Sequence, residues 1–410
     1  MDIDPRTLDE EIDRELGWTD GSAKPRRSAA YWQRLLGGMS HTSRAGQFVG
    51  RMVRRFRVFF LFPLVSPLSA HRSYDVNGNL TVVKRSVLWR LADALLMRVL
   101  LTPVILGLFL MMMVWLTTHP SHIHAMQTPG GLNLVYKDVD LLTFDGHRLA
   151  AWYVPPMSAD DVMISGEHVL DQKWPAVVVA HGLGTTHDVY LPMTRVLHEA
   201  GFAVLLLDLR GQGDSAPSAV TFGIRERLDV LAGVKYLRSL PAIDPMHVCV
   251  TGQGIGAAAA LHAAALDSSI AAVVADGVWP SFDTRVQSFF DQPNAPTRWL
   301  APLYEVTFEM MLRERLGELN LGGSVRSLSR QPVLFLAYPG SEQAPLAEVL
   351  ALAESTAAPH QVIVAQDGQR AGDLSQARRI TDFLTTTCHW VSPRARAREQ
   401  INDLLKTQVK

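Results

Sequence analysis

The stretch HVCVTGQGIGAAAALHAAAL (residues 247–266) is the part of this sequence that says most about its fold. It opens with an apolar run that ends in glycine, as a buried strand of a parallel sheet does. Gly252, Gly254 and Gly256 stand at alternate positions, and a run of alanine and leucine that favours a helix comes next. A buried strand that turns directly into a helix predicts an α/β fold.

The same alternation continues on both sides of this stretch. Asp145-Gly146 separates the strand-like runs 139–144 and 149–154 and predicts an opening hairpin. The other expected strands are 174–182, 202–211, 247–252, 270–277, 332–338 and 360–365, and the expected helices are 191–201, 225–240, 256–266 and 375–384. This pattern predicts a doubly wound, mostly parallel sheet with helices on both faces, in a domain at 134–390 followed by a helical tail at 391–410.

Three short motifs lie in this domain in a fixed order. His181-Gly182 follows a strand, DLRGQGDS (208–215) fits the pattern D-x-R-G-x-G-x-S, and Gly223, Glu226 and Asp229 fit G-x-x-E-x-x-D. Together they resemble the α/β-hydrolase superfamily, in its serine-peptidase-like and esterase-like branch. The resemblance implies a hydrolase fold with a small helical cap, which would occupy residues 278–330.

The three catalytic positions that the resemblance implies carry the wrong residues. The nucleophile turn G-x-S-x-G is replaced by a turn with Gly254 at its centre, and a glycine has no nucleophile. The acid position is Ser341, with Glu342 beside it. The histidine position is Arg370, which stays protonated and cannot act as a general base. The sequence therefore predicts a protein that does not hydrolyse its ligand.

A hydrolase with an unrecognised set of catalytic residues is the second hypothesis. It would use Asp276 or Glu342 as the acid together with a displaced histidine. His181, His187 and His198 follow the third strand, where structural roles are favoured. We expect no cofactor and no metal, because neither a phosphate-binding nor a dinucleotide-binding fingerprint occurs, and HPSHIH (119–124) reads as polar sequence beside a membrane.

A binding pocket can outlast the loss of the catalytic residues. The backbone N–H groups of Leu183 and Ile255 occupy the positions of the family's oxyanion hole, and Gly254 leaves room above the turn. We therefore expect a small acyl or carboxylate ligand at Leu183, Gly254 and Ile255, or else a protein partner. Aromatic residues of the cap would pack it onto the sheet; they are Trp279, Phe282, Phe289, Phe290, Trp299 and Tyr304.

A membrane span is predicted before the α/β domain. Residues 99–116 carry no charge, and a helix of this length reaches about 27 Å, close to the thickness of a bilayer's hydrocarbon core. Lys84, Arg85, Arg90 and Arg98 precede the run, whereas only histidines follow it closely. The positive-inside rule then predicts a single-pass protein whose N-terminus is cytoplasmic and whose α/β domain is outside the cytoplasm.

The region before this run divides by charge. Residues 1–40 combine an acidic amphipathic segment with a linker, and residues 41–98 form a basic stretch suited to an anionic membrane surface. A second uncharged stretch at 58–70 is short for a span, but it would reverse the topology if it crossed the membrane. A scaffold that works through its cytoplasmic head is a third hypothesis.

Composition hides this organisation. The chain has 410 residues, is 48% hydrophobic and has a net charge of −1. Residues 1–98 nevertheless hold 16 basic and 10 acidic residues, and the remainder holds 23 basic and 30 acidic residues. The acidic α/β domain gives no basic surface for nucleic acid. Two cysteines exclude a disulfide framework, and Cys249 lies in an apolar strand that predicts a buried thiol.

Overall fold

The computed structural model describes residues 70–74, 80–84, 87–157, 163, 171–282, 286, 289–290, 297–341, 344–365, 374–393 and 395–396. The predicted acidic segment, the stretch 58–70 except its last residue, and most of the predicted C-terminal tail lie outside these residues. The chain divides into two units that meet between Leu106 and Gly107, and each unit is described by itself.

The first unit contributes a hairpin and the beginning of a long helix. Strands β1 (Ala70–Tyr74) and β2 (Leu80–Lys84) pair antiparallel. Helix α4 (Val87–Thr118) follows and continues into the second unit. Within α4, the stretch Leu95–Thr118 contains the predicted uncharged run and is the one helix of the described residues long and apolar enough to cross a membrane. Of its most apolar 18-residue window only 11% is buried, whereas the core helix of a soluble protein is mostly buried.

The second unit is built around an eight-stranded sheet of order β10-β9-β8-β7-β5-β6-β4-β3. Its strands are β3 (Lys137–Leu142), β4 (Arg148–Val154), β5 (Trp174–Ala180), β6 (Ala203–Leu207), β7 (Ile243–Gln253), β8 (Val273–Asp276), β9 (Val333–Ala337) and β10 (His360–Val364). The pairs β3–β4 and β4–β6 are antiparallel, and all other pairs are parallel. The predicted α/β class with an opening hairpin is confirmed.

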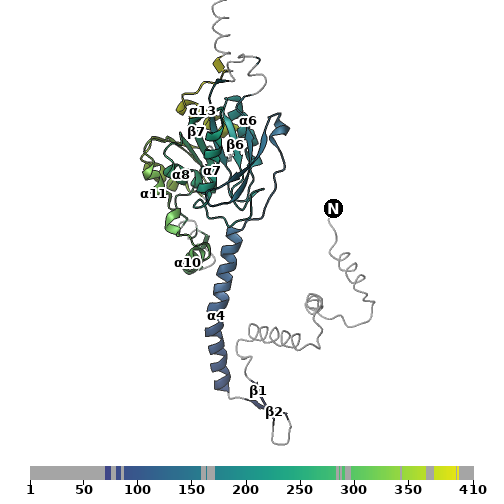
Figure 1. The fold of residues 1–410 in the computed structure, drawn as a ribbon. Coiled ribbons are helices and arrows are strands. Elements are labelled where there is room, and N and C mark those ends of the chain that lie inside the picture. The colour runs from purple at the N-terminus through teal and green to yellow at the C-terminus, as the bar shows by residue number, and fades with distance from the viewer. Residues whose placement is uncertain are drawn as a thin grey trace, which may run out of the picture. The chain divides into compact units, whose positions relative to one another are not determined.

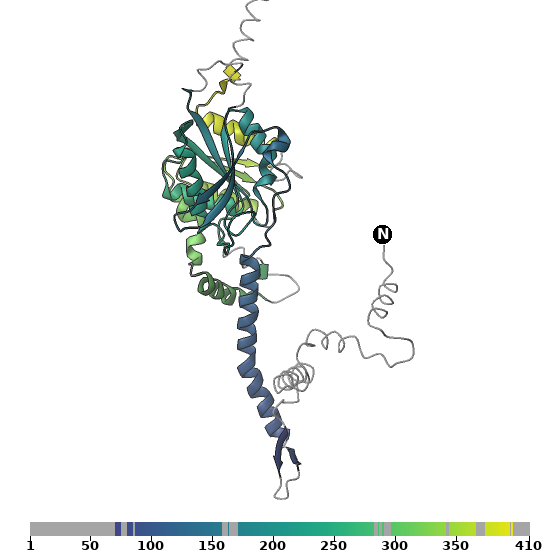
Figure 2. The same ribbon diagram turned by 45° about the vertical axis from the view of Figure 1, so that its right-hand side comes forward.

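Helices cover both faces of this sheet (Figures 1 and 2). Helices α6 (Leu191–Glu199) and α13 (Leu374–Thr387) pack together on one face, and α7 (Glu226–Ser239), α8 (Ile255–Leu266) and α11 (Leu321–Ser327) pack together on the other. Every residue of β5, β6 and β9 is buried, which explains why these strands read as continuous apolar runs. Helix α12 (Leu346–Glu354) lies against β9 and β10.

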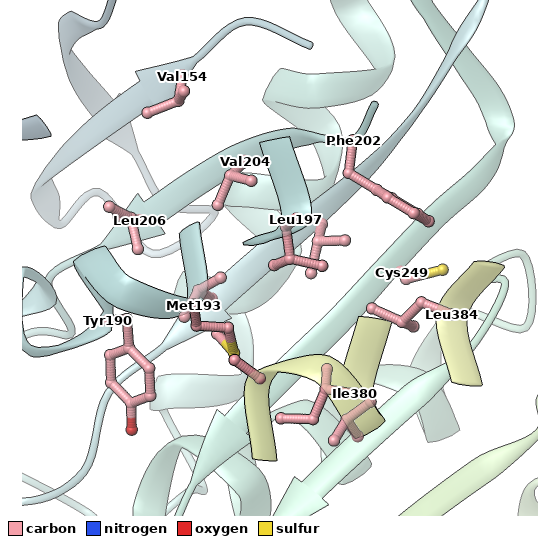
Figure 3. Close-up of a cluster of buried hydrophobic side chains, with 14 of the residues drawn as sticks. Val154, Tyr190, Met193, Leu197, Phe202, Val204, Leu206, Cys249, Ile380 and Leu384 are labelled. Atoms are coloured by element: carbon pink, nitrogen blue, oxygen red, sulfur yellow. The ribbon is translucent and has the colours of Figure 1, made fainter. Parts of the chain in front are cut away.

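The core beneath α6 and α13 is aliphatic and contains one close pair of thiols. Figure 3 shows Leu197 and Phe202 beside Leu384 and Cys249. The Sγ atoms of Cys249 and Cys388 are 3.4 Å apart, and both side chains are buried. The buried state of Cys249 matches the sequence prediction. Its neighbour does not follow from the sequence, because 139 residues separate the two cysteines.

A buried guanidinium joins three separate segments of the domain. Arg210 is 1% exposed, and its Nη2 lies 2.6 Å from Oδ1 of Asp229 in α7. Its Nη1 lies 2.6 Å from Oδ2 of Asp145 in the β3–β4 turn. The hydrogen bond from Arg210 lowers the pKa of Asp145 to about 2. Burial raises the pKa of the Asp229 carboxyl, and Arg210 opposes that rise. The loop 208–215, hereafter the motif loop, is therefore held between the β3–β4 hairpin and α7.

Two more motif carboxylates hold loops in place. Glu226 accepts hydrogen bonds from the backbone N–H groups of Thr221 and Gly223, at 2.7 and 2.8 Å. Asp208 accepts from the backbone N–H of Asp214 at 2.9 Å, and a Cβ at Gly213 would overlap the Asp208 carboxylate. Gly213 has φ 56°, a value that favours glycine. The spacing of the residues in the two motifs thus reflects the folding of the loops beside the sheet.

Replacing Arg210 should destabilise the domain much more than replacing an exposed arginine. In Arg210→Gln the Asp229 carboxyl stays buried without its counter-ion, and we expect a loss of about 3 kcal/mol or more in the free energy of unfolding. Arg148→Gln is the control, because Arg148 pairs with Asp140 on the surface, where side chains are 55% and 73% exposed. There the expected loss is below about 1 kcal/mol. Urea denaturation of the detergent-solubilised chain measures both, and equal losses would contradict this account of Arg210.

Candidate functional site

The tight turn between β7 and α8 has the geometry that its glycines predict. Gly254 stands at the N-terminus of α8 with φ 52° and ψ −109°, a conformation that side chains rarely adopt. A Cβ at Gly252 would overlap the backbone of Gly256, and a Cβ at Gly256 would overlap the carbonyl oxygen of Ala180 in β5. The helix therefore begins directly against the sheet, and its N-terminus faces the carboxyl ends of the strands.

The space above Gly254 is occupied by an aromatic ring. An ideal Cβ built on Gly254 would lie 3.3 Å from Cζ3 of Trp279, whose side chain is 5% exposed. We expected the missing side chain to leave room for a ligand here, and the indole takes up that room instead. A serine at this position would require the ring to shift by a few tenths of an ångström.

The acid position contains a side chain with a structural role. Ser341 follows β9, and its Oγ accepts a hydrogen bond from the backbone N–H of Ala344 at 3.1 Å. Its own N–H donates to the carbonyl of Tyr338 at 3.2 Å. The serine thus closes a turn. The neighbouring Glu342 and the predicted histidine position, Arg370, lie outside the described residues.

A buried carboxyl group lies beside the turn. Asp276 ends β8, is 4% exposed, and accepts the backbone N–H of Gly254 through its carbonyl oxygen at 2.9 Å. Burial raises the pKa of its carboxyl to about 7, and a hydrogen bond with Tyr338 opposes this rise. Nearby, the hydroxyl of Tyr190 donates to Oε1 of Gln253 at 2.7 Å. Burial raises the pKa of Tyr190, and the charge of Asp276 adds to that rise.

The histidines named in the sequence have partners within the fold. His181 accepts the backbone N–H of Leu209 at Nε2, at 3.1 Å, and burial lowers its pKa. Nδ1 of His187 lies 2.7 Å from Oδ1 of Asp208, and His198 contacts the carbonyl of Pro155 at 3.0 Å. These contacts fit the structural roles that we favoured for all three. Nδ1 of His181 contacts the carbonyl of Gly182 at 2.7 Å and the hydroxyl of Thr185 at 3.5 Å.

The histidines after α4 pack onto the motif loop. His122 contacts the carbonyl of Gly213 at 3.2 Å, and Nδ1 of His124 lies 2.6 Å from Oδ1 of Asp214. Within the part of the chain that the structure describes, no group of three or more His, Cys, Asp or Glu side chains could hold a metal ion.

A cavity of about 300 Å³ lies between the end of α4 and the cap. Its lining is apolar and aromatic and consists of Leu116, Thr117, Pro120, Leu183, Phe222, Phe282, Val286, Phe289, Phe290 and Tyr304. Of the predicted ligand-binding set, Leu183 lines this cavity, whereas Ile255 is fully buried at the start of α8. Sequence reasoning named the cap aromatics as packing residues. It missed Leu116, which it placed in the membrane span, Pro120, which it placed in polar sequence beside the membrane, and Thr117 between them.

A hydrogen bond holds the two walls of the cavity together. The hydroxyl oxygens of Thr117 in α4 and Tyr304 in α10 (Ala301–Leu312) are 2.6 Å apart. The ring of Phe282 lies 5.0 Å from that of Phe308, and the ring of Phe290 lies 5.7 Å from that of Tyr304. Such contacts between rings add to the energy of burial. The arrangement can hold an apolar chain.

The sheet topology and the glycine turn between β7 and α8 together define a domain of the α/β-hydrolase type. A model of the alpha/beta hydrolase family matches residues 177–400, more than half of the chain. The chain therefore belongs to the alpha/beta hydrolase family, as the motifs indicated.

Several known proteins are similar to parts of this chain. An uncharacterized protein, Rv2307c of Mycobacterium tuberculosis, is 30% identical over 125 residues, which is 30% of this chain and 40% of that protein. The quorum-quenching protein AidA of Acinetobacter baumannii is 38% identical over 104 residues, 24% of this chain and 34% of its own length. The chain thus spans less than half the length of these curated relatives.

A solved structure supports the fold itself. The esterase Pf2001 of Pyrococcus furiosus superposes with a TM-score of 0.50 at 22% sequence identity, over 67% of this chain and all of that chain. At this identity the likeness shows the fold and carries no statement about activity.

The buried carboxyl of Asp276 should make the stability of the domain depend on pH. Its pKa of about 7 in the folded state lies above the ordinary value of 3.8, so folding favours the protonated form. The stabilisation that the neutral Asp276 carboxyl gives to the folded state is fully present below about pH 4 and is lost as the pH rises through 7. Relative to Asp276→Asn, the wild-type chain should therefore lose up to about 4 kcal/mol of stability between pH 4 and pH 8.

Denaturation of both chains in detergent across this pH range measures the difference. Asp140→Asn is the control, because Asp140 is 73% exposed and its replacement should change stability by no more than about 0.5 kcal/mol. A difference between wild type and Asp276→Asn that is the same at pH 4 and pH 8 would show that the carboxyl is not held in its neutral form.

Proposed function

We propose that this chain is a membrane-anchored α/β-hydrolase-fold protein that binds an acyl or carboxylate ligand without cleaving it. The observation that carries the proposal is the nucleophile turn, where Gly254 has no side chain and the ring of Trp279 lies 3.3 Å from the position of a Cβ. Covalent catalysis needs a side-chain nucleophile with a base beside it. The turn offers neither, whereas the domain has a cavity with an apolar lining that includes Leu183.

The cavity fits the hydrocarbon part of such a ligand. Its wall is formed by aromatic and aliphatic side chains, with the hydroxyls of Thr117 and Tyr304 bonded to each other. Burying a methylene group in such a site contributes about 0.8 kcal/mol. The affinity of the cavity for an acyl chain should therefore rise with each methylene group that the cavity buries. Leu183, whose backbone N–H stands at an oxyanion-hole position of the family, also lines this cavity.

A hydrolase with displaced catalytic residues is the second candidate. The observation in its favour is Asp276, because a buried carboxyl with a strongly raised pKa beside a cleft is typical of functional sites. Catalysis would still require a nucleophile and a base. The contacts of His181, His187 and His198 tie these three rings to the loop after β5, the motif loop and Pro155. A binding function requires neither a nucleophile nor a base, so it accounts for the site with fewer residues than a hydrolase would need.

The membrane anchor of the proposal is α4. Its stretch Leu95–Thr118 has the length and composition of a span, and basic residues precede it, while histidines follow it. By the positive-inside rule, the N-terminus would be cytoplasmic and the α/β domain extracytoplasmic. The bilayer and a ligand or protein partner are then the proposed binding partners.

Filling the cavity should abolish ligand binding. The full chain in phospholipid nanodiscs should bind a fluorescent fatty acid saturably, and Leu183→Trp should weaken this binding at least tenfold, since the indole would occupy the cavity. Met246→Trp is the matched control, because Met246 is 66% exposed and does not line the cavity; it should bind as the wild type does. Fluorescence titration measures all three.

Two outcomes would overturn the binding function. One is that Leu183→Trp binds the fluorescent fatty acid as tightly as the wild type does, which would show that the cavity is not the binding site. The other is covalent labelling by a fluorophosphonate probe, or turnover of p-nitrophenyl esters that disappears when one Ser or Thr is replaced. That outcome would establish the hydrolase instead.

A reporter fused after residue 130 tests the topology. Alkaline phosphatase at this position should be active, because it folds outside the cytoplasm, whereas green fluorescent protein should be dark when exported in unfolded form. A fusion before residue 58 gives the reference for the opposite side. Fluorescence of the fusion after residue 130, without phosphatase activity, would place the domain in the cytoplasm and indicate that 58–70 also crosses the membrane.

A further inference from the structure

Helix α10 exposes a continuous apolar stripe. Trp299, Leu303, Val306 and Met310 are 61%, 40%, 64% and 66% exposed. Their spacing of four, three and four residues places them on one face of the helix and the short turn that leads into it (Arg298–Leu300). A helix on the surface of a soluble domain normally presents polar side chains on this side.

The opposite face of α10 is apolar as well, and it is buried. Tyr304 and Phe308 are 4% and 0% exposed and pack against the aromatic residues of the cap. Helix α10 therefore binds the domain through one apolar face and presents a second apolar face outward. The outward face has no partner among the described residues that would explain its composition.

The position of α10 is fixed to the end of α4. The hydroxyl of Tyr304 in α10 is hydrogen-bonded to that of Thr117 in α4. The end of α4 is in turn held in the domain, because the carbonyl of Thr118 accepts the N–H of Val220 at 2.7 Å. Val114 and Thr118 are fully buried. These residues all belong to the second unit, and Figures 1 and 2 show α10 beside this last part of α4. The stripe is thus held next to the point where α4 enters the domain.

Cations stand at both ends of the stripe. Arg298 precedes it, and Arg313 and Arg315 follow it, all three with exposed side chains. Aromatic and aliphatic side chains flanked by arginines are the composition of a helix that lies in the interface of a membrane, where the arginines reach the lipid phosphates. Phe289, which is 57% exposed and lines the cavity, extends the same apolar surface.

We propose that α10 is a second membrane contact, whose stripe Trp299, Leu303, Val306 and Met310 lies in the surface of the bilayer that α4 spans. The inference rests on the proposed function, because it needs α4 in the membrane. The occupant of the stripe is phospholipid, since α4 keeps the stripe at the bilayer surface. Docked in this way, the cavity between α4 and α10 lies at the level of the headgroups and acyl chains, so that its ligand can come from the bilayer.

Site-directed spin labelling of the full chain tests this proposal. Labels are placed at Val306→Cys and, as an independent second site, at Met310→Cys, with Cys249 and Cys388 replaced by serine and the chain in nanodiscs of phosphatidylcholine and phosphatidylglycerol. We expect the ratio of collision rates with oxygen and with a water-soluble nickel chelate to be several-fold higher at both sites than at Met246→Cys. Met246 is the matched control because its exposure of 66% equals that of Met310.

A label at Leu108→Cys distinguishes the membrane span of α4 from the docking of α10 on the bilayer. Leu108 is 62% exposed within the predicted span and should show the highest ratio. A high ratio at Leu108 with Val306 and Met310 equal to Met246 would overturn the docking of α10 and leave the span intact. A ratio at Leu108 equal to that of Met246 would overturn the span itself, and with it the docking.

Discussion

The structure depends on the contact between the first turn of α8 and strand β5. Gly256 lies so close to the carbonyl oxygen of Ala180 that no side chain fits, and Gly252 lies equally close to Gly256. This approach places the N-terminus of α8 at the carboxyl end of the central strands, where α/β proteins bind their ligands. It also fixes Gly254 under Trp279 and brings the N–H of Gly254 to the carbonyl of Asp276. The strand-turn-helix scaffold of the family is thus kept, with Gly254 at the centre of the turn.

The residues that the family motifs name are used for folding. Arg210 holds Asp145 and Asp229, Glu226 holds the loop before α7, and Asp208 holds the loop 208–215. Apart from Asp145, whose side chain is 35% exposed, these groups are buried, and their hydrogen bonds satisfy polar groups that would otherwise be costly to bury. Motifs of this kind identify a family because the fold needs them.

The parts of the molecule that the sequence predicts are those determined by local pattern. Continuous apolar runs give β5 to β10, Asp145-Gly146 gives the hairpin, and the spacing of glycines gives the turn at Gly254. Trp279 above Gly254, the thiol pair of Cys249 and Cys388, and the bond between Thr117 and Tyr304 join residues 25, 139 and 187 positions apart. No periodicity reports such contacts, because they arise from packing of distant elements. For the same reason the sequence placed Leu116 in the membrane alone, whereas it also lines the cavity.

The glycine at the turn has a further consequence for the energetics of the domain. A residue with a side chain at φ 52° and ψ −109° stores about 1–3 kcal/mol of backbone strain, which enzymes retain because the strained residue does their chemistry. Glycine adopts this conformation without that cost. Gly254 therefore relieves the turn of the backbone strain that a side chain at this position would store, and the start of α8 is held against the sheet without that cost in stability.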